Sequence, residues 1–168
     1  MEVRSQILTR YMLPLREGGS LPVLGEGDDG FKYVVKLRGA GHGRKALIAE
    51  FLGSLIAKAF KFKVPEVVLL ELSPMFGITE PDEEVQELLR NSEGLNVGLH
   101  FLPGAATFDP AVNGVDELTA SKIVWLDAFL TVLDVLGIRE KCPHAGQRTM
   151  SLPCCVASAQ SCAAFRCL

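Results

Sequence analysis

The chain has 168 residues, of which 48% are hydrophobic and 22% charged, and its formal net charge at pH 7 is −3. This length and composition exclude a disordered chain and predict one modest globular domain with a real core. The weak net charge excludes a strong electrostatic footprint for nucleic acid, and no polybasic run suggests a membrane surface. No apolar run reaches the roughly 18 residues of a membrane span and no signal peptide is recognisable, so we expect a cytoplasmic protein without a membrane partner.

The first elements predict an antiparallel β-meander. Strands are expected at 6–15, 21–27 and 31–39, with a two-glycine turn after the first and an Asp-Gly turn at 28–30 after the second. From Lys45 to Phe60, apolar pairs recur every four residues, which predicts a helix with one broad apolar stripe. The pairs are Leu47/Ile48, Phe51/Leu52, Leu55/Ile56 and Ala59/Phe60.

The following elements alternate between strands and helices. A strand is expected at 63–72, a short helix with an acidic first turn at 81–92, and a strand at 94–102. In the last of these, Leu95, Val97 and Leu99 alternate with polar or small residues, so one buried face is expected. After a loop rich in Pro, Gly and Asn, a second long helix is expected from Asp116 to about residue 136, with an apolar stripe.

Residues 32–50 run from an apolar strand through a glycine cluster into a helix. One interpretation is a dinucleotide-binding fold whose phosphate turn would be formed by Gly39, Gly41 and Gly43. The next apolar strand would then supply the acidic Glu71. Against this interpretation, the third glycine falls one position early, and a strand covered on both faces would not carry Lys36 and Arg38.

A kinase-like nucleotide site is the second interpretation. Phosphoryl transfer needs a cation on a rigid strand, a helix carboxylate that holds this cation, and a flexible glycine turn over the phosphates. Lys36 would be the cation, Glu50 the carboxylate, and Gly18-Gly19-Ser20 the turn. On spacing alone, we favour a simpler alternative, in which Lys36 ends a strand in solvent and Glu50 is a surface residue of the helix.

Six segments together resemble the HipA-like kinase domain family. In chain order they are PLREGGSLP, YVVKLRGAG, KALIAE, VPEVVLLEL, GLNVGLHFLPGA and WLDAFLT, and they span roughly residues 3–134. The resemblance implies an α+β fold with a protein-kinase-like N-terminal lobe, consisting of an antiparallel β-sheet and one main helix. A hinge would join this lobe to the start of a helical C-terminal lobe. The resemblance also implies that ATP and Mg²⁺ bind between the lobes, and that phosphate is transferred to serine or threonine of a protein substrate that the sequence does not name.

The resemblance implies roles for individual residues. Lys36 is similar to the nucleotide lysine and Glu50 to its helix partner, while Trp125 and Asp127 fall in the helix that leads to the catalytic loop. The implied nucleotide-binding residues are Gly18, Gly19, Ser20, Lys36, Glu50, Phe101, Leu102, Pro103 and Gly104. The last four belong to the adenine-side hinge.

At the catalytic loop the chain departs from the family. Relatives carry a pattern similar to Asn-x-Asp-Arg, then Asn-x-Asn and a later Asp, in which the first Asp accepts the substrate proton and the later groups hold magnesium. Asp134 stands at the distance from Thr131 that is expected of the catalytic base. However, Val135 replaces the arginine, and no Asn or Asp follows. Asp134 is our candidate base, the alternative being the polar side of a continuing helix, and no metal ligand is identified.

The C-terminal tail has a different composition from the rest of the chain. All five cysteines lie within residues 142–168, which contain no Asp or Glu. The cysteine spacing is unlike that of a zinc site, and the odd number argues against a disulfide framework. We expect residues 135–168 to be a disordered tail that results from a reading-frame shift or a misannotated splice, the alternative being a folded extension.

These predictions divide the chain into a nucleotide-binding lobe at 1–102, a hinge and the beginning of a helical lobe at 103–134, and the tail. The predicted function is a HipA-like serine/threonine kinase-type domain that binds ATP. We expect the domain to be truncated before the metal-binding half of its site and catalytically impaired. The alternative is a non-catalytic module, a pseudokinase fragment that binds nucleotide or a partner protein.

Overall fold

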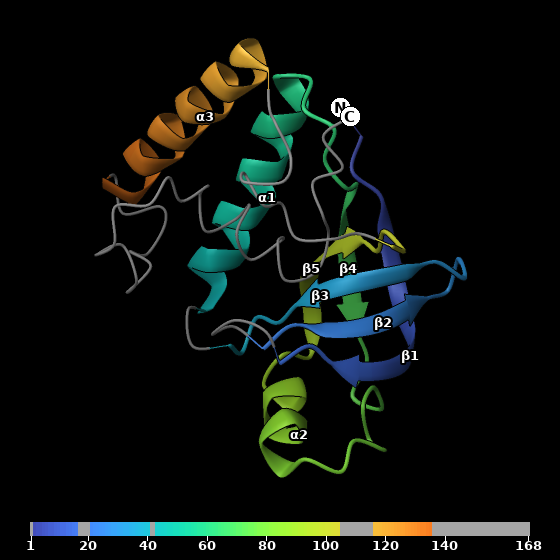
Figure 1. Ribbon diagram of the computed structural model, residues 1–168. Coiled ribbons are helices and arrows are strands. Elements are labelled where there is room, and N and C mark those ends of the chain that lie inside the picture. Colours follow the sequence, from blue (N-terminus) through green and yellow to red (C-terminus); the bar gives the residue numbers. More distant parts are fainter. Residues whose placement is uncertain (1, 17–20, 41–42, 105–115, 136–168) are drawn as a thin grey trace. The chain divides into compact units, whose positions relative to one another are not determined.

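The computed structural model describes residues 2–16, 21–40, 43–104 and 116–135. Within these ranges the elements form an α+β fold, as predicted, with five strands and three helices (Figure 1). In chain order they are β1 (Ser5–Pro14), β2 (Val23–Gly27), β3 (Lys32–Lys36), α1 (Gly43–Ala59), β4 (Val67–Leu72), α2 (Glu83–Arg90), β5 (Gly94–His100) and α3 (Glu117–Val135).

The chain divides into two compact units. Unit 1 comprises residues 1–47 and 65–101, and unit 2 comprises residues 48–64 and 102–168. All five strands and α2 therefore belong to unit 1, α3 belongs to unit 2, and α1 contributes residues to both. In the described parts of the chain, no helix is sufficiently long and apolar to cross a membrane.

The five strands close into a barrel in the order β1-β2-β3-β5-β4. The predicted meander is confirmed, because β1, β2 and β3 are antiparallel neighbours. The prediction of an antiparallel sheet is wrong at one seam, where Ser5–Leu8 of β1 pairs in parallel with Leu69–Leu72 of β4. This pairing removes the two sheet edges, whose unpaired backbone groups would otherwise be exposed.

The barrel interior is apolar, and α2 packs against it (Figure 1). Two residues of α2, Val85 and Leu89, belong to the same buried cluster as residues of the strands. The other buried members are Leu8, Val23, Tyr33, Val35, Leu37, Val68, Leu70, Leu72 and Phe76. The cluster joins β1, β2, β3, β4 and α2 into one core within unit 1.

Strand β5 departs from the expected single buried face. Asn96 and Gly98 are buried as well as Val97 and Leu99, whereas Leu95 is 54% exposed. The physical reason is the position of β5 between β3 and β4, which makes it a central strand of the barrel. A central strand is often covered on both faces. Alternation of apolar residues with polar or small ones then does not show which face is exposed to solvent.

Helix α1 confirms the helix predicted from Lys45 to Phe60, but its burial does not follow the predicted stripe. Ile48 is 51% exposed, while the small residues Ala49, Gly53 and Ala57, spaced four apart, are buried. Within unit 2, Ala57 forms a buried pair with Leu126 of α3. Small residues spaced four apart on a helix let another element approach closely. The predicted stripe was drawn from the large apolar side chains, so it did not indicate that these small residues would be the buried ones.

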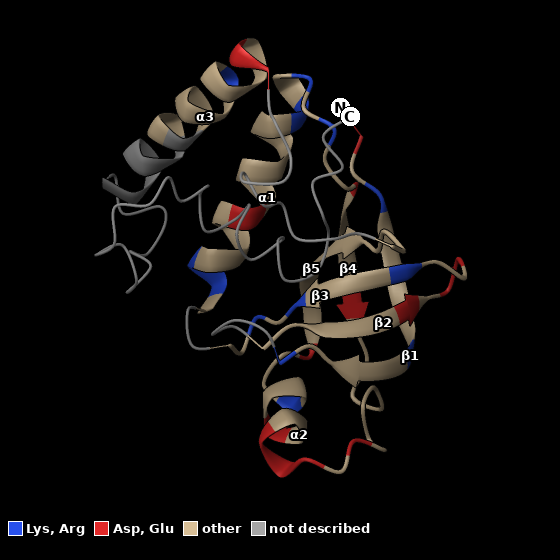
Figure 2. Cartoon of the chain, in the orientation of Figure 1, with Lys and Arg blue, Asp and Glu red and all other residues tan. Residues whose placement is uncertain are grey.

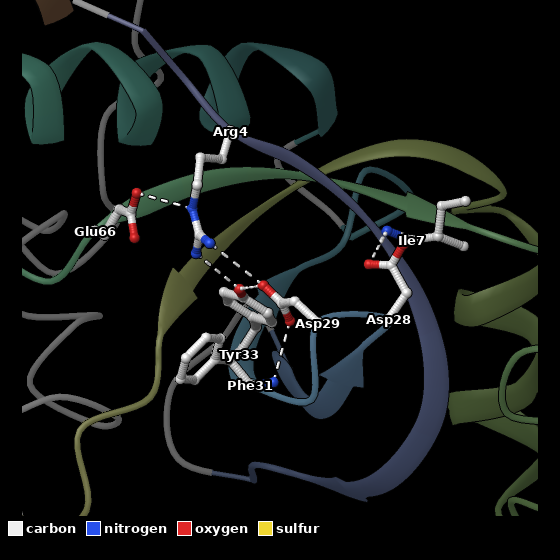
Figure 3. A network of polar contacts seen from close by, with 7 residues as sticks. All are labelled: Arg4, Ile7, Asp28, Asp29, Phe31, Tyr33 and Glu66. Carbon is white, nitrogen blue, oxygen red and sulfur yellow. Dashed lines mark hydrogen bonds and ion pairs between the residues drawn. The ribbon is translucent and has the colours of Figure 1, made fainter.

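A polar network joins the residue before β1 to the β2–β3 turn and to the segment before β4 (Figure 3). Arg4 donates to Glu66 Oε1 at 3.1 Å and to the Tyr33 hydroxyl at 3.1 Å, and it lies 3.5 Å from Asp29 Oδ2. Tyr33 in turn donates to Asp29 Oδ2 at 2.6 Å. Burial and, after it, the hydrogen bond to Asp29 raise the pKa of Tyr33 from 10.0 to about 12.

This pKa predicts a stability loss at high pH. Because the folded-state pKa lies above the ordinary value, neutral Tyr33 stabilises the fold below pH 10.0, and this contribution disappears as the pH rises through about 12. The full loss is about 3 kcal/mol, at ~1.4 kcal/mol per pKa unit. Tyr33→Phe lacks the hydroxyl that titrates. Between pH 10 and about 12, its free energy of unfolding, measured by urea denaturation, should therefore fall less than that of the unsubstituted chain. Equal pH slopes for the two proteins would contradict the prediction.

Candidate functional site

The side chain of Lys36, the last residue of β3, is only 4% exposed. The alternative in which this lysine ends the strand in solvent is therefore wrong. Lysine is rarely buried to this extent unless another group compensates its charge, because the interior solvates an ammonium poorly. The burial of Lys36 therefore indicates a structural or functional role for this side chain.

Strand alternation places Lys36 on the outer face of the barrel. Val35 and Leu37, its neighbours in sequence, belong to the interior cluster, and successive side chains of a strand point to opposite faces. Val34 therefore shares the outer face with Lys36. Val97 of β5 lies directly opposite Lys36 in the β3–β5 pairing.

A row of four apolar side chains, which we name the outer row, crosses this face beside Lys36. Val34 pairs with Leu24 of β2 and with Leu99 of β5, and Leu99 pairs with Val67 of β4. All four are buried, with exposures between 0% and 7%. This row was not predicted from the sequence. The position of Val34, two residues before Lys36, indicates that the two share a face. The other three members could not be foreseen, because strand neighbours and register are set by the whole sheet.

The predicted adenine-side hinge follows β5. The backbone N–H of Phe101 donates to Lys32 O at 2.8 Å, which extends the contact between β5 and β3 beyond the strand end. Pro103 and Gly104 are exposed and form a turn, in which Gly104 has φ +75°. A proline followed by a residue with positive φ is typical of a type II turn. Phe101 belongs to unit 1 and Leu102 to unit 2, so this segment is one of the three points at which the chain passes between the units.

Glu50 is the only acidic residue of α1 and is half-buried (Figure 2, red on α1). It belongs to unit 2, whereas Lys36 belongs to unit 1. The ion pair between Glu50 and Lys36 therefore stays a prediction. Gly18, Gly19 and Ser20 lie outside the described residues. The base of their loop is closed by Leu15 N, which donates to Pro22 O at 2.8 Å.

The dinucleotide interpretation of the glycine cluster is wrong. In that fold, the strands on either side of the helix are adjacent in the sheet, and the whole sheet around them is parallel. Here the strands before and after α1 are β3 and β4, and β5 lies between them, antiparallel to both. Gly39 has a packing role instead, because a Cβ there would lie 2.9 Å from both Asn91 Cβ and Ser92 Oγ.

The candidate base Asp134 lies one residue before the end of α3, so its backbone is helical. Its side chain and that of Asp127 lie outside the described residues, and its catalytic role stays a prediction. Trp125 is 54% exposed and contacts two aromatic residues of unit 2, with ring centroids 4.9 Å from Phe60 and 5.7 Å from Phe129. Of the tail predicted at 135–168, only Val135 is described, as the last residue of α3, and residues 105–115, where a loop was predicted, also lie outside the described residues.

Comparison with protein families matches residues 6–131 to the family described as HipA-like kinase. The match covers about three quarters of the 168 residues, from β1 into α3. No curated protein and no solved structure gives a significant match. The resemblance inferred from the six sequence segments is confirmed, and the chain belongs to the HipA-like kinase family.

Proposed function

We propose that this chain is the nucleotide-binding lobe of a protein-kinase-like phosphotransferase and binds ATP on the outer face of its barrel. The observation that carries the proposal is the burial of Lys36, at 4% exposure, on the same face as the outer row. In protein kinases, the lysine that holds the nucleotide phosphates lies on the third strand, and its glutamate partner lies on the next helix. Lys36 ends the third strand here, and Glu50 is the only acid of the next helix.

The described residues suit the two chemically different parts of ATP. An ammonium attracts phosphate oxygens strongly in a site from which water is excluded. The outer row (Leu24, Val34, Val67 and Leu99) is buried and apolar, the residue chemistry that usually lines the site of a purine ring. The backbone of the hinge, from Phe101 to Gly104, would border the ring, and Gly18 to Ser20 would cover the phosphates.

No set of magnesium ligands is identified among the described residues. Within the described ranges, no three His, Cys, Asp or Glu side chains gather in a way that could hold a metal ion. Residues 135–168 contain no Asn or Asp, the residue types that hold magnesium in kinases. We therefore propose that phosphoryl transfer by this chain is impaired, since residues 135–168 supply no Asn or Asp that would hold the metal and so neutralise the transferred phosphate.

Isothermal titration of the intact chain with ATP and with adenosine tests nucleotide binding. We expect ATP to bind and adenosine to bind more weakly, because adenosine lacks the phosphates that Lys36 would hold. If ATP gives no heat of binding, the proposal fails, and only the assignment to the family remains.

A non-catalytic module is the second candidate function. It is favoured by the absence of Asn and Asp after Asp134, and by the exposed aromatic side chains of Trp125, Phe129 and Phe60 in unit 2. Exposed aromatic residues are enriched at protein–protein interfaces. Incubation with labelled ATP and Mg²⁺ distinguishes the two candidates. Phosphate incorporation that disappears in Asp134→Ala supports the enzyme, and nucleotide binding without incorporation supports the module.

A further inference from the structure

The second and third residues after β3 are held by two side chains, one from the segment between α2 and β5 and one from β5 itself. Lys36 is the last residue of β3 that pairs with β5. Beyond it, Arg38 N donates to Asn96 Oδ1 at 2.8 Å, and Gly39 N donates to Ser92 Oγ at 2.9 Å. Two polar side chains thus continue the backbone pairing after the regular strand contact has ended.

Ser92 and Asn96 are themselves fixed. Their exposures are 0% and 1%, respectively. The Asn96 amide donates to Ser92 O and Gly94 O, both at 2.8 Å, and the Ser92 hydroxyl donates to Leu88 O at 2.7 Å. Buried polar groups whose hydrogen bonds are all satisfied rigidify the structure around them. We name this pair of side chains the clamp.

The chain that leaves β3 has little freedom to shift relative to the clamp. Leu37 is buried in the barrel interior, at 2% exposure. Gly39 approaches the α2–β5 turn so closely that a Cβ would lie 2.9 Å from Ser92 Oγ. The Arg38 side chain also donates to the carbonyl oxygen of Glu93. The segment on the C-terminal side of Lys36 is therefore fixed by core packing and by three hydrogen bonds within unit 1.

We propose that Ser92 and Asn96 are positioning residues for Lys36. By holding residues 38 and 39, the clamp fixes the end of β3 and thereby the direction of the buried lysine side chain. The effect on nucleotide rests on the proposed function: if ATP binds to the outer face, the clamp sets where the ammonium meets the phosphates. Catalytic and binding groups work only within narrow geometric limits, so a support of this kind has a measurable effect.

Two readouts on the intact chain test the clamp. In Ser92→Ala and Asn96→Ala, the ¹³Cε signal of Lys36, identified by its absence in Lys36→Met, should move toward the signals of exposed lysines. ATP binding should weaken about tenfold, since a displaced ammonium keeps part of its attraction at longer range. Adenosine binding should stay unchanged, because adenosine has no phosphate for Lys36 to hold.

Gln86→Ala is the matched control. Gln86 lies on α2, and its side chain, like that of Asn96, donates to a backbone oxygen, that of Glu80, at 2.5 Å. The hydrogen bonds of its side chain are to Glu80 and Arg90, so its loss should destabilise the protein without moving the Lys36 signal. If Asn96→Ala does not fold, Ser92→Ala, which removes a single oxygen atom, decides the outcome.

The two readouts separate failure of the clamp from failure of the proposed function. An unchanged Lys36 signal in the clamp variants overturns the positioning role, as does an equal weakening of ATP and adenosine binding. If the intact chain binds no ATP, the proposed function fails, and the Lys36 signal alone then decides whether the clamp positions this side chain.

Discussion

Replacing Lys36 with methionine should weaken ATP binding about a hundredfold, because removing one member of a desolvated charge contact costs ~2–5 kcal/mol. Adenosine binding should change little, since the outer row stays intact. Methionine keeps an unbranched apolar side chain in the buried position, so the fold should be retained. Titration calorimetry with ATP, ADP, AMP and adenosine measures the effect of each phosphate separately.

Lys32→Met is the control for the loss of charge on this strand. Lys32 lies four residues before Lys36 on the same strand and outer face, but its side chain is exposed. Its replacement should leave ATP binding nearly unchanged, because solvent screens an exposed charge. Equal losses in the two variants would mean that overall charge, and not the buried lysine, governs binding.

Gly98→Ala should lower the free energy of unfolding by about 3 kcal/mol, near the upper end of the cost of overpacking a core. A Cβ at this position would lie 2.9 Å from Leu70 Cγ, closer still to Leu70 Cδ1, and 3.6 Å from Tyr33 Cβ. Leu70 and Tyr33 are both 0% exposed, so neither can move into solvent. Urea denaturation should show a lower midpoint with an unchanged slope.

Gly30→Asn is the matched control for a glycine substitution. Nothing lies within 4 Å of a Cβ at Gly30, and asparagine tolerates its φ of +77°. Its stability should change by less than about 0.5 kcal/mol, as expected of a surface substitution. In the Gly98→Ala background, Leu70→Ala should restore part of the lost stability, because it removes the colliding atoms. An additive double variant would contradict the collision as the cause.

Local patterns in the sequence predicted the elements well. The period of four from Leu47 onward predicted α1, and the Asp-Gly turn predicted the β2–β3 hairpin. Both features depend on residues that are close in sequence, so their signals are local. The family was also recognisable from the sequence, because six short segments occur in the same order as in its members.

The sequence alone did not predict which strands become neighbours. The parallel pairing of β1 with β4 joins segments about sixty residues apart, and no local pattern encodes such a contact. The strand neighbours of Lys36 have the same origin. A lysine at a strand end is usually solvated, and only the closure of the barrel, with β5 beside β3, brings the outer row to its side.

The sequence by itself thus determined the order and type of the elements, the family, and the residue types available for a nucleotide site. Only the tertiary structure decided which of these residues meet. It placed Ser92 and Asn96 against the end of β3, and it assigned Gly39 to close packing, where the sequence had suggested a phosphate turn. The physical reason is that hydrogen-bond propensity and hydrophobic period act within a few residues, whereas burial and side-chain contacts depend on the whole packed core.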